Sequence, residues 1–411
     1  MNITQAVLLA AGGSSRLWPL TTNRHKCELP LLGKTLLNRT LRVLVEKGIT
    51  NIVIVHHENH LIGVDEIDGV NVTFIPLDKP DGMGYALLRA ASELQEHFLL
   101  IHPYHVDAVT FLPKLLTAAE GKDAAILVAP PEKGKKGGLV TVTGDRVSSV
   151  EETVYTGQPD THYIQGMYIL STAYVETLKK EEPHHYSFES ALHTFASGHA
   201  VGYHHIAMPL VSLKYPWHLF DMRDYLMQHM TPSTSKQATI HPTAVIEGDV
   251  VIEDGASIGA YAVVRGPAYI GKHVFVGDHT LVRDGAVLEE GALAGAHAEV
   301  KNSIVMEGSY AQGYVADSII GKQVKVAHGF TTGNRRIDRG RISVTVGETK
   351  VDTGLTAFGV VIGDGASFGI TVSTMPGACV GSGAIVGPGT IVFGNVPEKT
   401  RHYVVQEIRH E

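Results

Sequence analysis

The sequence predicts two architectures in one chain, an α/β domain followed by a left-handed parallel β-helix. Two observations support this prediction. In the first half, apolar runs alternate with helical patterns, and in the second half an aliphatic residue or alanine returns at every sixth position. A spacing of six fits neither the 3.6-residue turn of an α-helix nor the two-residue repeat of a strand. It is typical of hexapeptide repeats, whose apolar residues point into a prism and stack from coil to coil.

The sixfold repeat runs without interruption from Ile240 to Val300 and resumes from Ile362 to Val392. Its members are Ile240, Ile246, Ile252, Ile258, Val264, Ile270, Val276, Val282, Leu288, Ala294 and Val300, then Ile362, Phe368, Thr374, Val380, Val386 and Val392. Glycine often follows, and we expect it at tight corners, where a positive φ is cheap only for glycine. The alternative, a β-sandwich with accidental spacing, would have to explain the whole unbroken run.

The first half is typical of a parallel sheet covered by helices. Strands are expected at 5–9, 51–56, 71–76 and 97–101, and helices at 35–48, 83–96 and 217–228. Strand patterns follow one another directly within 124–170, which predicts a mixed sheet with an added substrate-binding layer. We therefore expect the α/β domain over 1–228, a polar linker over 229–237 and the β-helix over 238–411, with an inserted loop near 331–361.

Composition limits the function classes. The chain has 411 residues and a net charge of −8, so it carries no overall basic field for nucleic acid. Its only two cysteines, Cys27 and Cys379, lie one in each half and do not form a disulfide framework, which favours a reducing cytoplasm. No apolar run approaches the roughly 18 residues of a membrane helix. We expect a cytoplasmic protein with neither nucleic-acid nor membrane partners.

The turn after the first strand has the features of a phosphate site. Ala10, Ala11, Gly12 and Gly13 have little or no side chain, so backbone N–H groups can approach a phosphate chain closely. Arg16 offers a fork of donors to phosphate oxygens, and ten residues later Lys26 supplies a second cation. The alternative is a glycine turn that caps a helix beside a surface arginine.

This segment resembles the sugar-1-phosphate nucleotidylyltransferase family. The chain has G-x-x-R-L-x-P-L-T from Gly13, then a lysine, then L-P-L-L-G-K-T-L-L over 29–37. The resemblance implies a Rossmann-like nucleotidyltransferase domain that joins an NTP to a sugar 1-phosphate and releases pyrophosphate. It also implies site residues: catalytic Arg16 and Lys26, nucleotide-binding Ala10, Ala11, Gly12, Gly13 and Gly82, and sugar-binding Gly138, Glu151 and Gly166.

The resemblance extends over nearly the whole chain. KYPWHLFDMRDYLM (214–227), TGNRRID and ITVSTMPG resemble segments of archaeal-type members that make UDP-N-acetylglucosamine by uridylyl transfer and acetyl transfer. Those members carry a hexapeptide-repeat domain at the C-terminal end. What this implies here is a homotrimer that uses Mg²⁺ and takes UTP or dTTP with a sugar 1-phosphate.

Several residues depart from the family pattern at the first site. Family members hold Mg²⁺ with two aspartates, and the matching positions are Tyr104 and His218. Mg²⁺ prefers oxygen ligands, so Asp107 and Asp221 are the candidate replacements. Glu152 stands where the family has a lysine, and Met83 replaces a threonine of the base-binding turn. The spacings of His102 with His105, and of His56, His57 and His60, also allow a transition-metal site.

The second site departs further from the family pattern. The histidine that acts as general base in acetyl transfer is replaced by Ala311, and a basic cluster is replaced by 355–357 (LTA). Tyr314, Asn334 and Arg336 remain as acyltransferase-like residues. His328 lies one repeat away and is either a substitute base or a surface histidine. We therefore expect that acetyl-CoA is not used. Besides the nucleotidylyltransferase, two hypotheses stay open: a regulatory homologue with impaired catalysis, and a hexapeptide acyltransferase.

Overall fold

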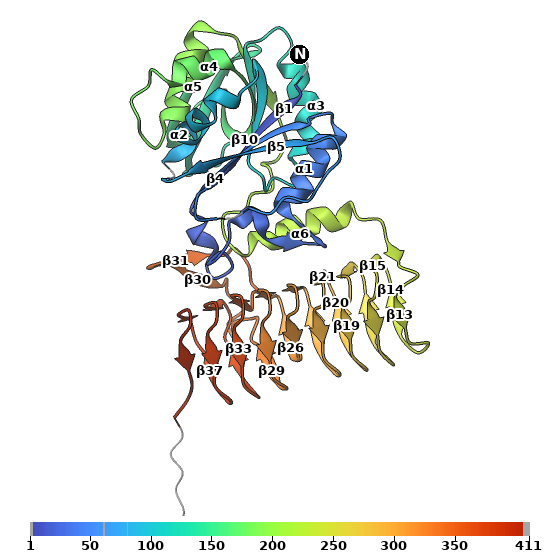
Figure 1. Ribbon diagram of the computed structural model, residues 1–411. Helices are drawn as coiled ribbons and strands as arrows, with labels where there is room; N and C mark the ends of the chain where they lie inside the picture. The colour runs from blue at the N-terminus through green and yellow to red at the C-terminus, as the bar shows by residue number, and fades with distance from the viewer. Residues whose placement is uncertain (1–2, 61, 80, 406–411) are drawn as a thin grey trace, which may run out of the picture. The chain divides into compact units, whose positions relative to one another are not determined.

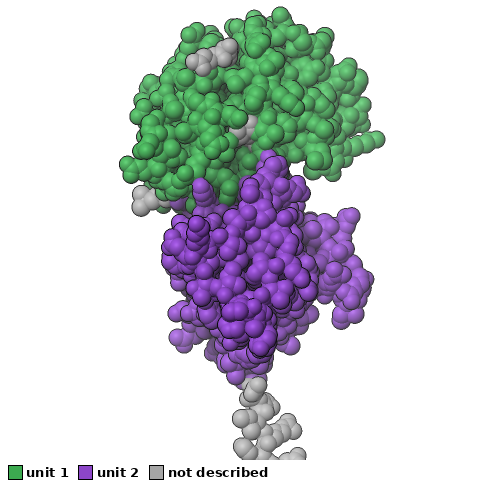
Figure 2. Space-filling model, turned by 90° about the vertical axis from the view of Figure 1, so that its right-hand side faces the viewer, with its two compact units in different colours: residues 1–13, 35–212 green, residues 14–34, 213–411 purple. Residues whose placement is uncertain are grey.

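The computed structural model describes residues 3–60, 62–79 and 81–405. The chain forms two compact units, coloured separately in Figure 2. The first unit holds Met1–Gly13 and Thr35–Ser212, and the second holds Ser14–Lys34 and Leu213–Glu411. The predicted fold class, a mixed α/β domain and a left-handed parallel β-helix, is confirmed.

The first unit is built on one mixed sheet with the strand order β11-β7-β10-β6-β1-β4-β5. These strands are β1 (Gln5–Ala10), β4 (Asn51–His57), β5 (Asn71–Leu77), β6 (His97–Ile101), β7 (Ala124–Ala129), β10 (Thr161–Ser171) and β11 (Val201–His205). Strands β6, β1, β4 and β5 are parallel, and β10 runs antiparallel to both β6 and β7. The antiparallel strands β8 (Lys136–Thr143) and β9 (Arg146–Val154) extend from β10. They form the added layer that the sequence predicts.

Helices cover both faces of this sheet (Figure 1). They are α1 (Leu36–Glu46), α2 (Gly82–Arg89), α3 (Ala108–Ala118), α4 (Thr172–Leu178) and α5 (Ser187–Gly198). Alternate residues of the central strands, such as Val7, Leu9 and Val53, form one core with apolar side chains of α2, α4 and α5. The predicted helix 83–96 ends early, because α2 stops at Arg89 and a 3₁₀ turn, η3 (Ala91–Glu93), follows.

The second unit begins with the segment 14–34, which contains two 3₁₀ turns and the first strand of a small pair. These are η1 (Ser15–Leu17), η2 (Lys26–Glu28) and β2 (Pro30–Leu31), which pairs with β3 (Lys34–Thr35). Helix α6 (His218–Gln228) precedes the β-helix, close to the predicted 217–228. Residues 14–34 and 213–228 therefore belong to the same compact unit as the β-helix. The predicted division at residue 228 stays a prediction.

The β-helix consists of stacked parallel strands in three columns. The first column is β12 (Ser233–Thr234), β15 (Val250–Ile252), β18 (Ala268–Ile270), β21 (Ala286–Leu288), β24 (Ile304–Val305), β27 (Ile319–Ile320), β32 (Val360–Ile362), β35 (Ala378–Val380) and β38 (Asn395–Val396). The second is β14 (Val245–Glu247), β17 (Val263–Arg265), β20 (Leu281–Arg283), β23 (Glu299–Lys301), β26 (Gly313–Ala316), β29 (Phe330–Thr332), β34 (Ser373–Thr374) and β37 (Ile391–Val392). The third is β13 (Thr239–Ile240), β16 (Ser257–Ile258), β19 (Phe275–Val276), β22 (Leu293–Ala294) and β25 (Tyr310–Ala311), then β28 (Lys325–Val326), β33 (Ser367–Phe368), β36 (Ile385–Val386) and β39 (Arg401–His402).

The register explains why the sixfold pattern is lost after Val300. Val250 pairs with Ala268 and Ala268 with Ala286, which is a coil of 18 residues. The next coils are shorter, since Val287 pairs with Ile304 and Ile304 with Ile319. Stacking therefore continues without interruption through the shortened coils. The insertion comes later, as the antiparallel hairpin of β30 (Ser343–Val346) and β31 (Thr349–Asp352), within the predicted 331–361.

The reason expected for the repeat glycines is wrong. Gly277, Gly369 and Gly381 are absent from the residues with positive φ. A Cβ on Gly277 would lie 2.5 Å from the backbone nitrogen of Ala296 in the next coil. These glycines therefore allow close stacking of coils. Non-glycine residues occupy several left-handed positions instead, including Tyr261 (φ 56°) and His279 (φ 57°), whose rings stack with centroids 5.0 Å apart.

Candidate active site

The predicted phosphate turn lies at the carboxyl end of β1, a central strand of the first unit. Ala10 and Ala11 are buried, whereas Gly12 and Gly13 are exposed. A Cβ on either glycine would meet no atom within 4 Å. Ligands of open α/β sheets bind beyond the carboxyl ends of the strands. The two glycines thus leave open space at the position where a phosphate chain is expected.

Arg16 and Lys26 belong to the second unit, in the segment that follows this turn. Arg16 is exposed in η1. The Lys26 ammonium donates to the carbonyl of Leu213 over 3.1 Å, and its backbone N–H donates to Ser14 Oγ. Burial lowers the pKa of Lys26 to about 8, and the charge of Arg16 contributes in the same direction. The structure thus brings the two predicted cations close enough to influence each other.

Packing requires a glycine at position 82. It has a φ of +81°, and a Cβ would lie 2.3 Å from the carbonyl oxygen of His185. Two residues further on, a Cβ on Gly84 would lie 2.5 Å from Ser187 Oγ. The first turn of α2 therefore packs directly against the start of α5. This contact alone explains a glycine at position 82, and its predicted role in nucleotide binding stays a prediction.

The strands of the added layer place Glu152, rather than Glu151, beside Gly138. Gly138 pairs with Glu152, and Leu139 pairs with Glu151. Opposed residues share a face of a sheet and successive residues alternate, so Glu151 lies on the other face, where it is exposed. A Cβ on Gly138 would lie 3.5 Å from Glu152 Oε2. The sugar-binding role predicted for Glu151 stays a prediction, and Glu152 is the carboxylate that reaches this glycine.

Glu189 on α5 is a further candidate that no sequence motif marks. Burial, followed by the charge of Glu152, raises its pKa to about 7. Burial also raises the pKa of Glu152, while Lys136 and His185 oppose that change. The Lys136 ammonium lies 5.1 Å from the ring centroid of Tyr186. Glu189, Lys136 and His185 thus form a polar cluster with Glu152, and the carboxyl of Glu189 in it holds a proton near neutral pH.

Three aromatic side chains occupy the end of β6, where the family pattern has an aspartate. The ring of Tyr104 stacks on His102 with centroids 5.3 Å apart and lies 4.9 Å from His105. His105 Nδ1 lies 3.1 Å from the carbonyl of Val211 and donates to it, which leaves Nε2 as the acceptor in the neutral ring. A Cβ on Gly166 would lie 2.6 Å from His102 Cδ2 and 2.9 Å from His105 Nε2. Only glycine fits there.

The candidate metal ligands do not assemble into a cluster. Asp107 is buried, its Oδ2 accepts from the backbone of Val211 over 2.8 Å, and its Oδ1 is buried without a hydrogen bond. Burial raises the pKa of Asp107. Burial, followed by the charge of Asp224, raises the pKa of Asp221, which lies in the second unit. Among the described residues, no three His, Cys, Asp or Glu side chains are placed to share a metal ion.

The histidine at the second family aspartate position, and those whose spacing allows a transition-metal site, make other contacts. His218 Nδ1 accepts from the backbone of Lys214 over 3.2 Å. His56 Nδ1 lies 3.0 Å from the carbonyl of His57 and 3.2 Å from that of His60. The ring atoms of His56 therefore serve the local turn. The transition-metal site expected from the spacing stays without support in the described part of the chain.

Of the three acyltransferase-like residues of the β-helix, Asn334 contacts Asp317. This buried carboxylate accepts from Lys301 Nζ over 3.1 Å and from the side-chain amides of Asn302 and Asn334. Arg336 is half-exposed and pairs with Asp338. Tyr314 lies on the neighbouring strand β26. Asn334 is thus held by a buried network, whereas Arg336 lies outside it.

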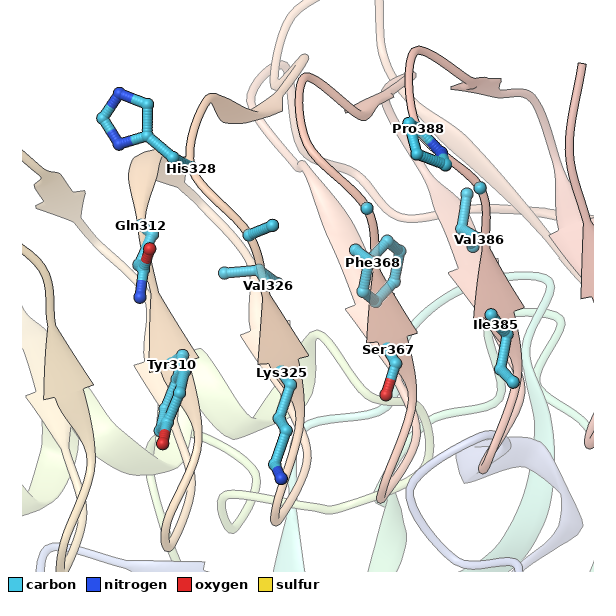
Figure 3. Close-up of a pocket in the computed structure, with 13 residues that line it drawn as sticks. Tyr310, Gln312, Lys325, Val326, His328, Ser367, Phe368, Ile385, Val386 and Pro388 are labelled. Carbon is cyan, nitrogen blue, oxygen red and sulfur yellow. The ribbon is translucent and has the colours of Figure 1, made fainter.

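Ala311 does not lie at a surface where a general base could act. It is fully buried, pairs with Ala294 on the preceding coil and belongs to the core of the prism. The remaining candidate base, His328, borders a groove of about 570 Å³ shown in Figure 3. Tyr310, Lys325, Ser367 and Ile385 lie along one side of this groove. Ala311→His would place an imidazole in this core, so we expect no gain of acetylation from it.

Two findings concern the chain as a whole. No described helix is both long enough and apolar enough to cross a membrane. Cys27 and Cys379 are both free and buried.

The geometry defines a class of protein, a nucleotidyl-transferase-like α/β domain joined to a β-helix, and comparison with known proteins supports this class. The family model described as nucleotidyl transferase matches residues 5–207. The bifunctional protein GlmU of Methanococcus aeolicus is 30% identical over 98% of both chains, and that of Methanocaldococcus jannaschii is also 30% identical over 98% of both. The bifunctional sugar-1-phosphate nucleotidylyltransferase/acetyltransferase of Sulfurisphaera tokodaii is 28% identical over 95% of this chain and 98% of its own.

The chain therefore belongs to the family of these two-domain GlmU proteins. The resemblance stated from the sequence motifs is confirmed over nearly the full length.

Proposed function

We propose that this protein transfers a nucleotidyl group from an NTP to a sugar 1-phosphate, giving an NDP-sugar and pyrophosphate. The observation that carries this proposal is the open turn after β1. Gly12 and Gly13 leave the turn unobstructed, and the chain continues directly into the segment with Arg16 and Lys26. The activity named for the Sulfurisphaera relative supports the same reaction.

The reaction brings several negative charges together. An oxygen of the sugar phosphate attacks the α-phosphorus of the NTP, a new O–P bond forms, and the bond to the pyrophosphate oxygen breaks. Positioning and charge stabilisation therefore account for most of the catalysis. The Arg16 guanidinium supplies one positive charge and a planar fork of donors for phosphate oxygens. Lys26, whose pKa is about 8, is mainly protonated at neutral pH and supplies the second positive charge.

A divalent metal is general among such enzymes, and Mg²⁺ would neutralise phosphate charge here. The residues at the predicted position do not fit a protein-held Mg²⁺ site, because Tyr104 and the imidazoles replace carboxylate oxygens and Asp107 already binds a backbone N–H. The dependence on Mg²⁺ stays a prediction, and so does the use of UTP or dTTP as the nucleotide donor.

The same aromatic cluster is the specific observation in favour of a second candidate function, a regulatory protein that binds nucleotide without turnover. The reading as an acyltransferase is the weakest, because Ala311 is in the core. We also propose a cytoplasmic homotrimer. The two buried free thiols support the compartment, and the exposed apolar side chains of Phe275 and Ile385 on one column of strands support association.

Nucleotide binding tests the proposal directly. Gly12→Ala introduces a methyl group into open space, so the fold should tolerate it while a bound phosphate chain should not. Arg16→Ala should weaken NTP affinity by about 1–3 kcal/mol, the usual size of a charge-assisted hydrogen bond. Gly198→Ala, whose Cβ also meets no atom within 4 Å, is the matched control. Titration calorimetry that gives the same affinity for the wild type and both site variants would contradict the assignment.

A further inference from the structure

The segment with the two predicted cations is fastened to the β-helix at three separate places. Residues 14–34 lie between β1 and α1 in the sequence, yet they group with the solenoid rather than with the sheet. Each fastening joins this segment to a carboxylate that is far away in the sequence. The three carboxylates are Glu289, Asp364 and Glu398, and they lie on different coils.

The first fastening is a pair of hydrogen bonds to Glu398. Its Oε1 accepts from the indole N–H of Trp18 over 2.8 Å and from the hydroxyl of Thr22 over 2.6 Å. The hydroxyl of Ser382 donates to the carbonyl of Pro19 over 3.3 Å. Hydrogen bonds to an ionised acceptor are about twice as strong as neutral ones. Glu398 therefore holds both sides of the turn that follows Arg16.

The second fastening is an ion pair between Arg24 and Asp364. The two side chains are only 12% and 24% exposed. Asp364 is itself held in place, since its Oδ1 accepts from the backbone of Lys322 over 2.8 Å. A partly buried ion pair is screened less by salt than a surface pair. Arg24 is two residues from Lys26, so this contact fixes the approach to the second cation.

The third fastening holds the end of the segment. The backbone N–H of Gly33 donates to Glu289 Oε2 over 2.8 Å, and Glu289 is 2% exposed. Gly33 has a φ of +77°, and a Cβ there would lie 2.3 Å from the hydroxyl oxygen of Tyr269. The backbone thus lies directly on the solenoid at this point. Between the second and third fastenings, Lys26 is bound to Leu213 and Ser14.

We propose that the β-helix positions the nucleotidyl-transfer cations, with Glu398, Asp364 and Glu289 as positioning residues that act through the segment 14–34. This inference rests on the proposed function. A misplacement of about 1 Å in a catalytic group can cost roughly 10²-fold in rate. Contacts with three carboxylates on separate coils restrict the movement of the segment 14–34 far more than its covalent links to residues 13 and 35 do. The β-helix thereby contributes to nucleotidyl transfer, because it holds the segment that carries Arg16 and Lys26.

Steady-state pyrophosphate release by full-length variants tests this inference. Glu398→Ala removes the acceptor of both Trp18 and Thr22, and we expect kcat/KM to fall about tenfold or more, mainly through kcat. Glu398→Gln keeps an oxygen acceptor at the same place and should restore most of the rate. Glu289→Ala should also lower kcat/KM. The control is Glu290→Ala, which removes the adjacent, exposed glutamate side chain and should leave the rate unchanged.

Hydrogen exchange of residues 14–34 and the melting temperature separate positioning from loss of structure. We expect faster exchange confined to this segment in Glu398→Ala, with melting within about 2 °C of the control. Unchanged turnover despite faster exchange would overturn the proposal, and so would a rate loss that Glu398→Gln does not restore. If the wild type releases no pyrophosphate, the proposed function fails, and NTP affinity becomes the readout. Weaker binding by Glu398→Ala then supports positioning, and equal binding overturns it.

Discussion

The half-buried carboxyl of Glu189 gives a stability prediction with a defined pH dependence. Burial raises its pKa from 4.5 to about 7. The folded state therefore holds a proton that the unfolded state loses, and stability falls as the pH rises from about 4.5 to 7. Each pKa unit corresponds to 1.36 kcal/mol, so ionised Glu189 destabilises the fold by about 3 kcal/mol above pH 7. Glu189→Gln removes this cost.

Scanning calorimetry of Glu189→Gln at two pH values tests the argument. At pH 8 the variant should be more stable by about 3 kcal/mol, which is roughly 6–12 °C in melting temperature for a unit of this size. At pH 5 the gain should be less than about 1 kcal/mol, because the wild-type carboxyl is already protonated in the fold. Glu182→Gln, at an exposed glutamate, is the control. An equal gain at both pH values, or no gain at pH 8, would refute the reasoning.

Three further outcomes are expected. NTP affinity should fall between pH 7 and 9, because Lys26, with its pKa of about 8, loses its charge in this range. Calorimetry of Lys26→Arg should show an affinity that depends less on pH. The same pH dependence in the wild type and the variant would contradict a role of Lys26 in NTP binding. Acetylation of glucosamine 1-phosphate should be negligible in a thiol-release assay, because losing a general base costs about 10²–10⁴ in rate. Brisk acetylation would show that another base acts, with His328 the first candidate. Light scattering should give a trimer at micromolar concentration, and a monomer would remove that prediction.

The sequence predicted the architecture well, because both halves depend on periodic burial. The apolar positions from Ile252 to Val300 all point into the prism, as the sixfold spacing requires. The shortened coils after Val300 were missed, since a coil that loses one to three residues keeps its stacking while the period disappears. Helix α3 was missed as well, and its internal Pro113 lacks the N–H that a regular helix uses.

The candidate site was predicted only in part, because motifs identify residues without their neighbours. The phosphate turn could be found from glycine, arginine and lysine in a known order. Glu189 could not, since its raised pKa comes from burial beside Glu152, a contact between α5 and β9 that no local pattern encodes. The same holds for Glu398, which meets Trp18 from 380 residues away in the sequence.

Pyrophosphate release from a panel of NTPs and sugar 1-phosphates, with and without Mg²⁺ or Mn²⁺, tests the central claim most directly. The proposed function predicts release that requires both an NTP and a sugar 1-phosphate, and that is lost in Arg16→Ala. Nucleotide binding by calorimetry with no release from any pair would contradict it, and would identify the protein as a regulatory homologue whose aromatic cluster at Tyr104 has replaced a working metal site.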